Sequence, residues 1–224
     1  MDDALHMAPL FAGLDNDAAD ALRSTMTEVE LARGRMLFQE GDPGDALYVM
    51  ISGKIKLVRK ANDGRENLLA VLGPGEMFGE LSVFDPGPRS TAAMAVTKVK
   101  LLVLSQADLV PWLRDRPEVA GGLLRQLAGR LRRTSETAAD LVFTDVPGRV
   151  AKALLDLSQR FGTASPDGLL VHHDLTQEEL AQLVGASRET VNKALADFVA
   201  RGWIKLEQKS VTLTDVERLR HRSR

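Results

Sequence analysis

Four residues between positions 79 and 90 carry groups that suit a sugar phosphate. Arg89 and Ser90 offer a positive charge and a hydroxyl donor to an anionic phosphate. Glu80 only accepts hydrogen bonds when it is ionised, so it suits a sugar hydroxyl, and Gly79 lets a ligand approach the backbone closely. No Gly-Lys-Ser/Thr run follows, which excludes a Walker loop, and no helix is predicted to follow, which excludes a dinucleotide fingerprint. The same residues also fit a polar surface loop in which Arg89 pairs with Asp85.

A second set of polar residues begins two short helices in the C-terminal third of the chain. Thr176 and Glu179 have the spacing of a capping box, in which the hydroxyl accepts from the Glu179 amide and the carboxylate accepts from the Thr176 amide. The first helix ends at Gly185, and Ser187 then caps the second. Two short helices joined by a tight turn that contains glycine are typical of a helix-turn-helix.

The second of these helices has an apolar and a polar face. Val191, Leu195 and Phe198 are spaced as one buried stripe. The polar residues lie mostly near the start of the helix, where a recognition helix contacts base edges: arginine donates twice to guanine, glutamate accepts from cytosine, and hydroxyls suit phosphates. The alternative is a solvated face on which two charged residues pair at i, i+4. The predicted DNA-binding set is Thr176, Gln177, Ser187, Arg188, Glu189, Thr190, Asn192 and Lys193.

A long helix is predicted from Pro117 to about Phe143, between the candidate sugar-phosphate site and the helix-turn-helix. Its residues at 120, 124, 127, 131, 134, 138 and 141 recur in alternating steps of four and three. This heptad seam is the pattern of two helices packed against each other and predicts a homodimer, while packing of the helix on its own domain is the alternative. Thr134 occupies a seam position where an aliphatic residue would pack better, so it either sets the register or has a ligand to bind.

The chain before residue 105 has the pattern of an antiparallel β domain. Short β-prone runs at 47–51, 54–58, 67–72 and 99–104 are separated by glycines, and turn signals at this spacing favour a barrel or a jelly roll. Asn62, Asp63 and Gly64 predict a hairpin turn because they tolerate positive φ. A breaker at 145–148 starts a second unit. There we expect a helix at 150–161, a loop at 162–168, a strand at 169–171, the two short helices and a terminal hairpin.

The residues around the second short helix resemble a known family. VGASRETV at 184–191, FTDVPGRVA at 143–151 and NKALADF at 192–198 resemble the cyclic-AMP receptor protein (CRP/FNR) superfamily, in particular its actinobacterial Crp/GlxR-type members. The resemblance extends over essentially the whole chain. It implies that Arg188, Glu189 and Lys193 read bases. The enteric representative has arginine at the third position, and lysine here keeps the charge but loses the bidentate fork.

A second resemblance concerns the ligand. GPGEMFGELS at 73–82, followed by RSTA at 89–92, resembles the phosphate-binding cassette of cyclic-nucleotide-binding domains. It implies cyclic AMP as the allosteric effector and no metal: Arg89 and Ser90 hold the cyclic phosphate, Glu80 holds the ribose 2′-hydroxyl, and its neighbours line the ribose. Two hydroxyl residues of the long helix, one from each chain, are implied to face the adenine amine at the dimer interface. The implied ligand set is Gly79, Glu80, Leu81, Ser82, Arg89, Ser90, Thr134 and Ser135.

These patterns together imply an α+β fold. We expect an N-terminal cyclic-nucleotide-binding β-roll (jelly roll) over 1–116, a dimerisation helix and hinge over 117–145, and a C-terminal winged helix-turn-helix over 146–224. The implied function is a cyclic-AMP-responsive transcription regulator that binds palindromic TGTGA/TCACA-like double-stranded DNA as a homodimer, with RNA polymerase as a further partner. A same-fold regulator that senses another ligand, or binds DNA without one, stays open. The lack of cysteine excludes iron–sulfur sensors, whereas methionine ligands leave haem-binding relatives open.

The composition is that of a globular chain with an aliphatic core. Hydrophobic residues make up 44% and charged residues 27%, and there is no cysteine for disulfides, thiolate metal sites or nucleophiles. The start, Met1-Asp2-Asp3, lacks a signal-peptide pattern, and no apolar run is long enough to span a membrane, so we expect a cytoplasmic protein. From residue 146 onward there are twelve Lys/Arg and ten Asp/Glu, so DNA contacts must come from a local patch.

Two other classes of function are disfavoured. The only cluster that suggests an enzyme is His172-His173-Asp174, and adjacent strand residues point to opposite faces of a sheet, so we expect no catalytic or metal site there. A cyclic-nucleotide-gated channel or kinase regulatory subunit would lack the helix-turn-helix.

Overall fold

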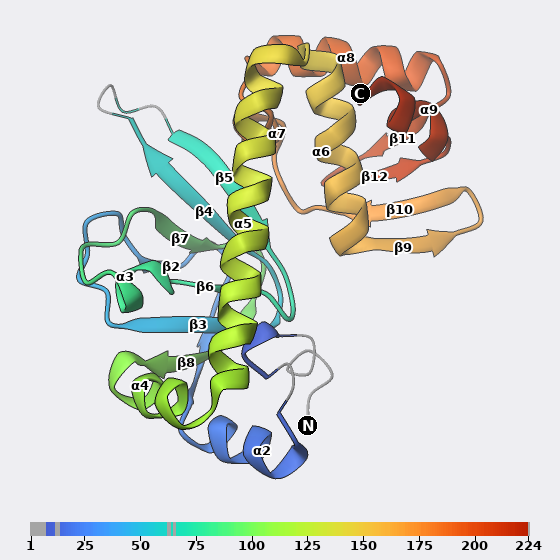
Figure 1. Ribbon diagram of the computed structural model, residues 1–224. Helices are drawn as coiled ribbons and strands as arrows, with labels where there is room; N and C mark the ends of the chain where they lie inside the picture. Colours follow the sequence, from blue (N-terminus) through green and yellow to red (C-terminus); the bar gives the residue numbers. More distant parts are fainter. Residues whose placement is uncertain (1–7, 12–13, 62–63, 65, 224) are drawn as a thin grey trace. The chain divides into compact units, whose positions relative to one another are not determined.

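The computed structural model describes residues 8–11, 14–61, 64 and 66–223 (Figure 1). They form two compact units, one of residues 1–65 and 69–132 and the other of residues 133–224 together with 66–68. The acidic start of the chain lies outside the described residues, as do Asn62 and Asp63 of the expected hairpin turn. Gly64 has a φ of 84°, as such a turn requires.

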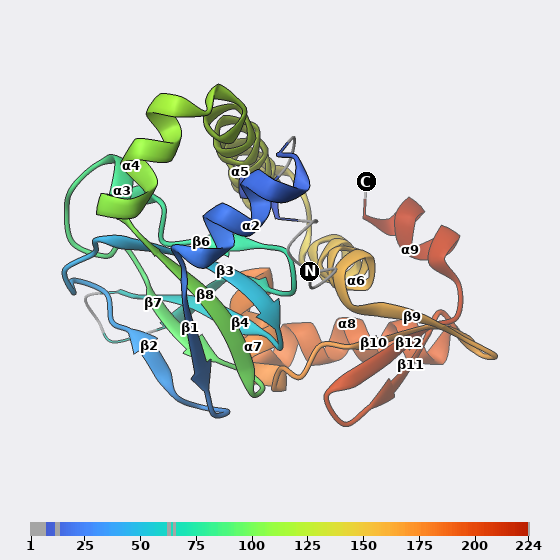
Figure 2. The same cartoon turned by 90° about the horizontal axis from the view of Figure 1, so that it is seen from below.

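The first unit is built on two four-stranded sheets with antiparallel pairing, in the orders β1-β8-β3-β6 and β2-β7-β4-β5 (Figure 2). This confirms the expected β-roll. Four short strands, β1, β2, β6 and β7, lie outside the runs that the sequence predicted. The strands are β1 Thr27–Leu31, β2 Met36–Phe38, β3 Ala46–Ser52, β4 Ile55–Lys60, β5 Glu66–Leu72, β6 Met77–Phe78, β7 Ala92–Ala95 and β8 Val99–Ser105.

The sheet that contains β3 and β8 is buried on both faces, because successive side chains of these strands join different cores. Leu47 and Val49 of β3 join a core that includes helical residues, whereas Met50 joins a core formed between the two sheets. In β8, Leu102 and Leu101 divide between the same two cores. Successive strand side chains point to opposite faces, so a run of apolar residues is what a strand buried on both sides requires.

Two helices of the first unit begin at a side chain that caps them. The carboxylate of Asp15 accepts from the amide of Ala18 at 2.8 Å, and the hydroxyl of Ser105 accepts from the amide of Asp108 at 3.1 Å. A one-turn helix, α3, stands where the sequence predicted none. The helical segments are η1 Pro9–Phe11, α2 Asn16–Ser24, α3 Leu81–Phe84, α4 Gln106–Asp115 and α5 Pro117–Phe143.

The long helix α5 leaves most of its large heptad residues uncovered. It starts at Pro117 as expected, and Leu124, Leu131 and Leu141 are 66%, 68% and 53% exposed. These are the leucines that a second helix would cover in the expected homodimer. α5 ends at Phe143, next to the predicted breaker, and the following helix begins at Val146.

The second unit places four helices around a four-stranded sheet of order β11-β12-β10-β9. The terminal hairpin β11–β12 is confirmed, and helix α9 was not predicted. The loop expected at 162–168 is wrong, because residues 162–165 pair with β10 as an edge strand through their backbone. Small and polar side chains hide such a strand from a hydrophobicity pattern. The elements are α6 Val146–Phe161, β9 Gly162–Ser165, β10 Gly168–His172, α7 Gln177–Val184, α8 Arg188–Ala200, β11 Ile204–Glu207, β12 Ser210–Leu213 and α9 Val216–Arg222.

Candidate functional site

Arg89 is buried in the first unit and is held by backbone carbonyl groups. Only 4% of the residue is exposed. Its Nη1 donates to the carbonyl of Gly79 and its Nη2 to the carbonyl of Ala46, both at 2.9 Å. Its own amide donates to the carbonyl of Asp42 at 2.8 Å. These bonds replace the pairing with Asp85 that a polar surface loop would show, so the guanidinium faces the interior of the cassette.

Glu80 is the second buried charge of the cassette, with 1% of the residue exposed. Arg130 of α5 donates from Nη1 to Glu80 Oε1 at 2.6 Å and from Nη2 to the carbonyl of Met77 at 2.7 Å. Arg130 was not predicted from the sequence. A signal was present, because Arg130 precedes Thr134 by four residues and therefore lies on the same face of the helix.

Two buried atoms of the cassette have no hydrogen-bond partner among the described residues, namely Glu80 Oε2 and Arg89 Nε. Buried polar atoms are nearly always paired, so each requires an explanation. One is an acceptor and the other a donor. A ligand that brings a hydroxyl and an anionic oxygen to the cassette would satisfy both, which is the chemistry of a ribose phosphate.

Glycines keep space open around the guanidinium. A Cβ atom at Gly44 would lie 2.7 Å from Arg89 Nε, and one at Gly79 would lie 2.9 Å from Arg89 Nη1. Gly79 also has a φ of 82°, which an L side chain rarely adopts. At both glycines a Cβ atom of any other residue would crowd the guanidinium.

Most of the other predicted ligand residues are exposed, and only one of them is buried beside Arg89. Ser82 is buried and a Cβ at Gly44 would approach its hydroxyl within 2.7 Å, whereas Leu81 and Ser90 are exposed. Thr134 and Ser135 are exposed on the part of α5 that belongs to the second unit. Their role toward a ligand in the first unit stays a prediction.

The second unit contains the predicted helix-turn-helix. The capping box is complete: Glu179 donates its amide to the Thr176 hydroxyl at 3.2 Å, and the Glu179 carboxylate accepts from the Thr176 amide at 2.7 Å. Gly185 makes the turn with a φ of 70°, and Ser187 caps α8 by accepting from the amide of Thr190. The local rules of helix capping therefore fix both helix starts.

α8 presents its polar residues as the sequence predicts. The stripe of Val191, Leu195 and Phe198 is buried, while Arg188, Glu189, Thr190 and Lys193 are exposed, as are Thr176 and Gln177 on α7. Asn192 is half-buried, and its Oδ1 has no partner among the described residues.

Two charged residues of α8 form the i, i+4 ion pair that a solvated helix face would have. Lys193 Nζ lies 2.7 Å from Glu189 Oε1, and the two side chains are 75% and 78% exposed. Exposed pairs of this kind contribute at most about 1 kcal/mol. The pair can therefore open when a base or phosphate competes for either residue.

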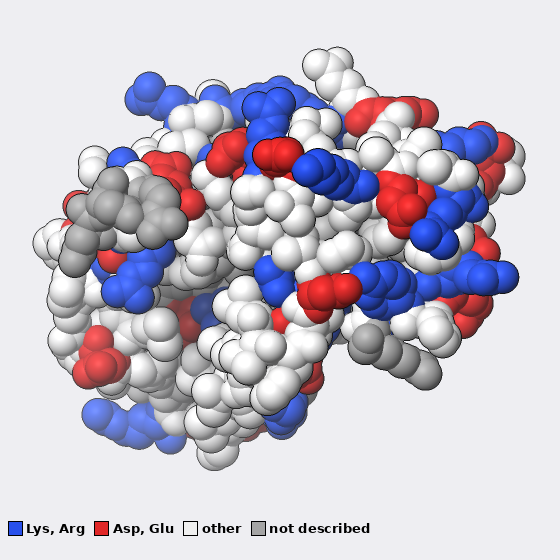
Figure 3. Space-filling view, turned by 90° about the horizontal axis from the view of Figure 1, so that it is seen from above, with Lys and Arg blue, Asp and Glu red and all other residues white. Residues whose placement is uncertain are grey.

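The charge around this region is mixed. The face shown in Figure 3 carries Lys and Arg side chains interspersed with Asp and Glu, not a continuous basic field. This mixed surface agrees with the near balance of charges from residue 146 onward, which led us to expect a local patch of DNA contacts and not a basic domain.

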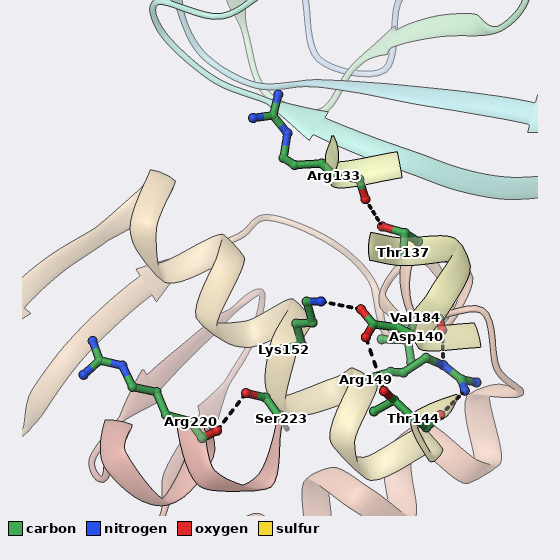
Figure 4. A network of polar contacts seen from close by, with 9 residues as sticks. All are labelled: Arg133, Thr137, Asp140, Thr144, Arg149, Lys152, Val184, Arg220 and Ser223. Carbon is green, nitrogen blue, oxygen red and sulfur yellow. Dashed lines mark hydrogen bonds and ion pairs between the residues drawn. The ribbon is translucent and has the colours of Figure 1, made fainter. Parts of the chain in front are cut away.

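A polar network joins the end of α5 to the turn of the helix-turn-helix (Figure 4). Arg149 of α6 donates from Nη1 to the carbonyl of Thr144 at 2.7 Å and from Nε to the carbonyl of Val184 at 3.0 Å. Asp140 of α5 accepts from both Lys152 Nζ and the Thr144 hydroxyl. This network was not predicted from the sequence, since its acceptors are largely backbone carbonyls that carry no side-chain signal.

Comparisons with known proteins agree with this geometry. Residues 28–115 match the cyclic nucleotide-binding domain family, and residues 148–222 match the Crp-like helix-turn-helix domain. The chain is 58% identical over 224 residues to the CRP-like cAMP-activated global transcriptional regulator of Mycobacterium tuberculosis, with 100% of both chains covered. It is 38% identical over 208 residues to the cyclic AMP receptor protein of Thermus thermophilus, with 93% of both covered.

A solved structure from another organism is similar over most of the chain. CLP, the c-di-GMP responsive global regulator of Xanthomonas campestris, is similar with a TM-score of 0.77 at 29% identity, covering 89% of this chain and 99% of that one.

These relatives are transcription regulators, which confirms the expectation that the chain is not an enzyme. His172, the last residue of β10, is exposed, whereas His173, just after the strand, is buried. None of the helices in the described part of the chain is long and apolar enough to cross a membrane. With a relative 58% identical over its whole length and both domain families matched in order, the chain belongs to the CRP/FNR family of transcription regulators.

Proposed function

We propose that this protein is a homodimer whose binding to palindromic DNA is controlled by cyclic AMP. The observation that carries the proposal is the pair of unpartnered buried atoms, Glu80 Oε2 and Arg89 Nε, in the domain that matches cyclic nucleotide-binding domains. The relative from Mycobacterium tuberculosis, which covers the whole chain, is named as cAMP-activated.

The proposed roles in the ligand site follow the chemistry of each residue. Arg89 and Ser90 donate to the cyclic phosphate, and Glu80 accepts from the ribose 2′-hydroxyl. Gly79, Leu81 and Ser82 line the ribose. Thr134 and Ser135, one from each chain, are proposed to bind the adenine amine.

The proposed dimer forms along the heptad seam of α5. Its support is the exposure of Leu124, Leu131 and Leu141, which a second copy of the helix would cover. Two-fold symmetry of the protein then calls for a palindromic operator. The two recognition helices must lie about 34 Å apart to enter successive major grooves. A ligand that favours this spacing would couple to DNA binding by about 1–3 kcal/mol.

The proposed base readers are Arg188, Glu189 and Lys193, on half-sites that resemble TGTGA and TCACA. Thr176, Gln177, Ser187, Thr190 and Asn192 are proposed to contact the backbone or neighbouring bases. We propose the functional division 1–116, 117–145 and 146–224 for the ligand domain, the dimer helix with its hinge, and the DNA domain. We further propose that the protein contacts RNA polymerase and acts in the cytoplasm.

The decisive experiment is a gel shift on a TGTGA–TCACA palindrome with and without cyclic AMP. We expect cyclic AMP to tighten binding by about 5- to 150-fold. Arg89→Ala removes the phosphate donor and should abolish this response while calorimetry detects no cyclic AMP binding. Arg188→Ala should bind cyclic AMP as the wild type does and lose the preference for the palindrome. Wild-type binding that is tight and insensitive to cyclic AMP would contradict the proposal.

A second candidate function is a regulator of the same fold with another nucleotide effector. It is favoured by the similarity to CLP, which is described as c-di-GMP responsive. Calorimetry with cyclic AMP, cyclic GMP and cyclic di-GMP separates the candidates. A response only to cyclic di-GMP would favour the second one.

A further inference from the structure

Three aromatic rings from three strands form a floor beneath Arg89. Phe38 ends β2, Tyr48 lies in β3, and Phe78 ends β6. The ring centroids of Phe38 and Tyr48 are 5.6 Å apart, and those of Tyr48 and Phe78 are 5.1 Å apart. The Cζ atom of Arg89 lies 4.5 Å from the centroid of Phe38 and 5.4 Å from that of Tyr48. The guanidinium therefore lies within cation–π distance of two faces of this floor.

A buried cation needs compensation, and the floor supplies part of it. None of the ion pairs found within the described residues includes Arg89, while Glu80 is engaged by Arg130. The carbonyls of Gly79 and Ala46 and the two ring faces are thus what stabilises the charge before a ligand binds. Burial raises the pKa of Tyr48, and the positive charge of Arg89 acts in the opposite direction, as expected for a phenol beside a cation.

The pairing of β3 with β6 places the aromatic floor next to the two carbonyl groups that accept from Arg89. Ala46, whose carbonyl accepts from Arg89, and Tyr48 are two residues apart in β3, so their side chains point to the same face of the sheet. Tyr48 is the antiparallel partner of Phe78, and Phe78 directly precedes Gly79, whose carbonyl also accepts from Arg89. Two carbonyls and two rings thus restrain both the position and the plane of the guanidinium.

We propose that Phe38 and Tyr48 are positioning residues that fix the plane of Arg89 and so set the affinity and the stereochemical selectivity for the phosphate of the cyclic nucleotide. The inference rests on the proposed function. Neither ring needs to touch the ligand, because each acts through the guanidinium. A planar donor held in one orientation distinguishes the two exocyclic oxygens of a cyclic phosphate, whereas a donor that is free to rotate does not.

The test uses the full-length protein and the two phosphorothioate diastereomers of cyclic AMP, which differ in the exocyclic oxygen that sulfur replaces. The wild type should bind one diastereomer several-fold more tightly. Phe38→Leu keeps apolar bulk but removes the ring face, and we expect about tenfold weaker binding of the preferred diastereomer, with the ratio of the two affinities moving toward one. Tyr48→Leu should act in the same direction, and Tyr48→Phe, which keeps the ring, should restore the wild-type ratio.

The matched control is Phe11→Leu. Phe11 is buried in the other core of the first unit, so the same chemical change is made away from Arg89. It should lower thermal stability without changing the ratio of affinities. If Phe38→Leu does not fold, Tyr48→Leu at a half-buried position carries the same test.

Several results would overturn the inference. A wild type that binds both diastereomers equally would exclude stereochemical selectivity, and variants that weaken both equally would reduce the rings to a structural role. In either case unmodified cyclic AMP still binds the wild type, and the proposed function stands. Failure of the wild type to bind cyclic AMP at all would overturn the proposed function and this inference with it.

Discussion

Arg130 closes over one side of the Glu80 carboxylate and leaves the other side free. Arg130 Nη1 lies 2.6 Å from Glu80 Oε1, while Glu80 Oε2 is buried without a partner among the described residues. The guanidinium of Arg130 therefore compensates the charge of Glu80 within the first unit, through a single carboxylate oxygen. The second oxygen is left as an acceptor, which suits a single sugar hydroxyl better than a second cation.

Replacing Arg130 should destabilise the first unit through Glu80. Arg130→Met leaves an uncompensated buried carboxylate, and we expect a loss of about 2 kcal/mol in the free energy of unfolding. The double variant Glu80→Gln/Arg130→Met removes that charge as well, so it should be more stable than Arg130→Met alone. Urea unfolding at neutral pH measures both. A double variant less stable than the single one would show that the carboxylate is satisfied in some other way.

Gly79 should be intolerant of any side chain for two separable reasons. Gly79→Ala forces alanine into positive φ and places a Cβ 2.9 Å from Arg89 Nη1 and 3.1 Å from the carbonyl of Ala46. Gly34→Ala is the matched control, because Gly34 has a φ of 78° and nothing within 4 Å of an added Cβ. We expect both variants to lose about 1 kcal/mol of stability, and only Gly79→Ala to lose cyclic AMP binding, by more than about tenfold because Arg89 is displaced. Melting curves and calorimetry separate the effects, and intact binding by Gly79→Ala would contradict this account.

The features that the sequence predicted well are those encoded within a few residues. The caps at Thr176 and Ser187 each rest on one side chain and an amide three residues later, so spacing alone identifies them. The buried stripe of α8 likewise follows from a period that a single helix fixes.

The features that it did not predict depend on partners far away in the chain. Strand β6 has two residues and exists because Tyr48 and Val49 of β3 pair with it. Arg130 contacts a residue 50 positions away, and Arg149 contacts one 35 positions away. Neither contact leaves a local periodicity, so only the fold reveals which charged side chains enter the cassette or the turn.

Arg188 should determine sequence selectivity, because it lies exposed at the first position of α8. Arg188→Ala should reduce discrimination between the palindrome and a variant at the contacted base pair by about 1–3 kcal/mol. The control is Arg201→Ala, which removes an exposed arginine just beyond the other end of α8 that is paired with Asp197. It should leave discrimination unchanged. Fluorescence anisotropy on the two duplexes at fixed salt measures the difference, and equal effects of the two substitutions would contradict the assignment.

Asp145 should make the free energy of unfolding of the second unit fall at low pH. Arg222 of α9 donates to Asp145 Oδ2 at 2.6 Å and the amide of Gly148 donates to Oδ1 at 2.9 Å, and these bonds, the first above all, hold the pKa of Asp145 below its usual value. A carboxyl with a lowered pKa in the folded state stabilises that state above its unfolded pKa of about 3.9, and loses this contribution as the pH falls through the folded value.

The variant Asp145→Asn isolates this contribution, because asparagine still caps α6 but carries no charge. At pH 7 it should be less stable than the wild type by less than about 1 kcal/mol, since the ion pair is largely exposed and screened. The difference should begin to shrink as the pH falls below about 4, the unfolded pKa, and should disappear only below the lowered pKa of the folded state. Arg222→Gln should reproduce the loss at pH 7, and 1 M salt should shrink it in both cases, because screening acts on the charge and not on the cap. Urea unfolding between pH 3 and pH 7 measures these differences, and a gap between wild type and Asp145→Asn that widens toward low pH would show that the cap, not the ion pair with Arg222, is what the carboxylate contributes.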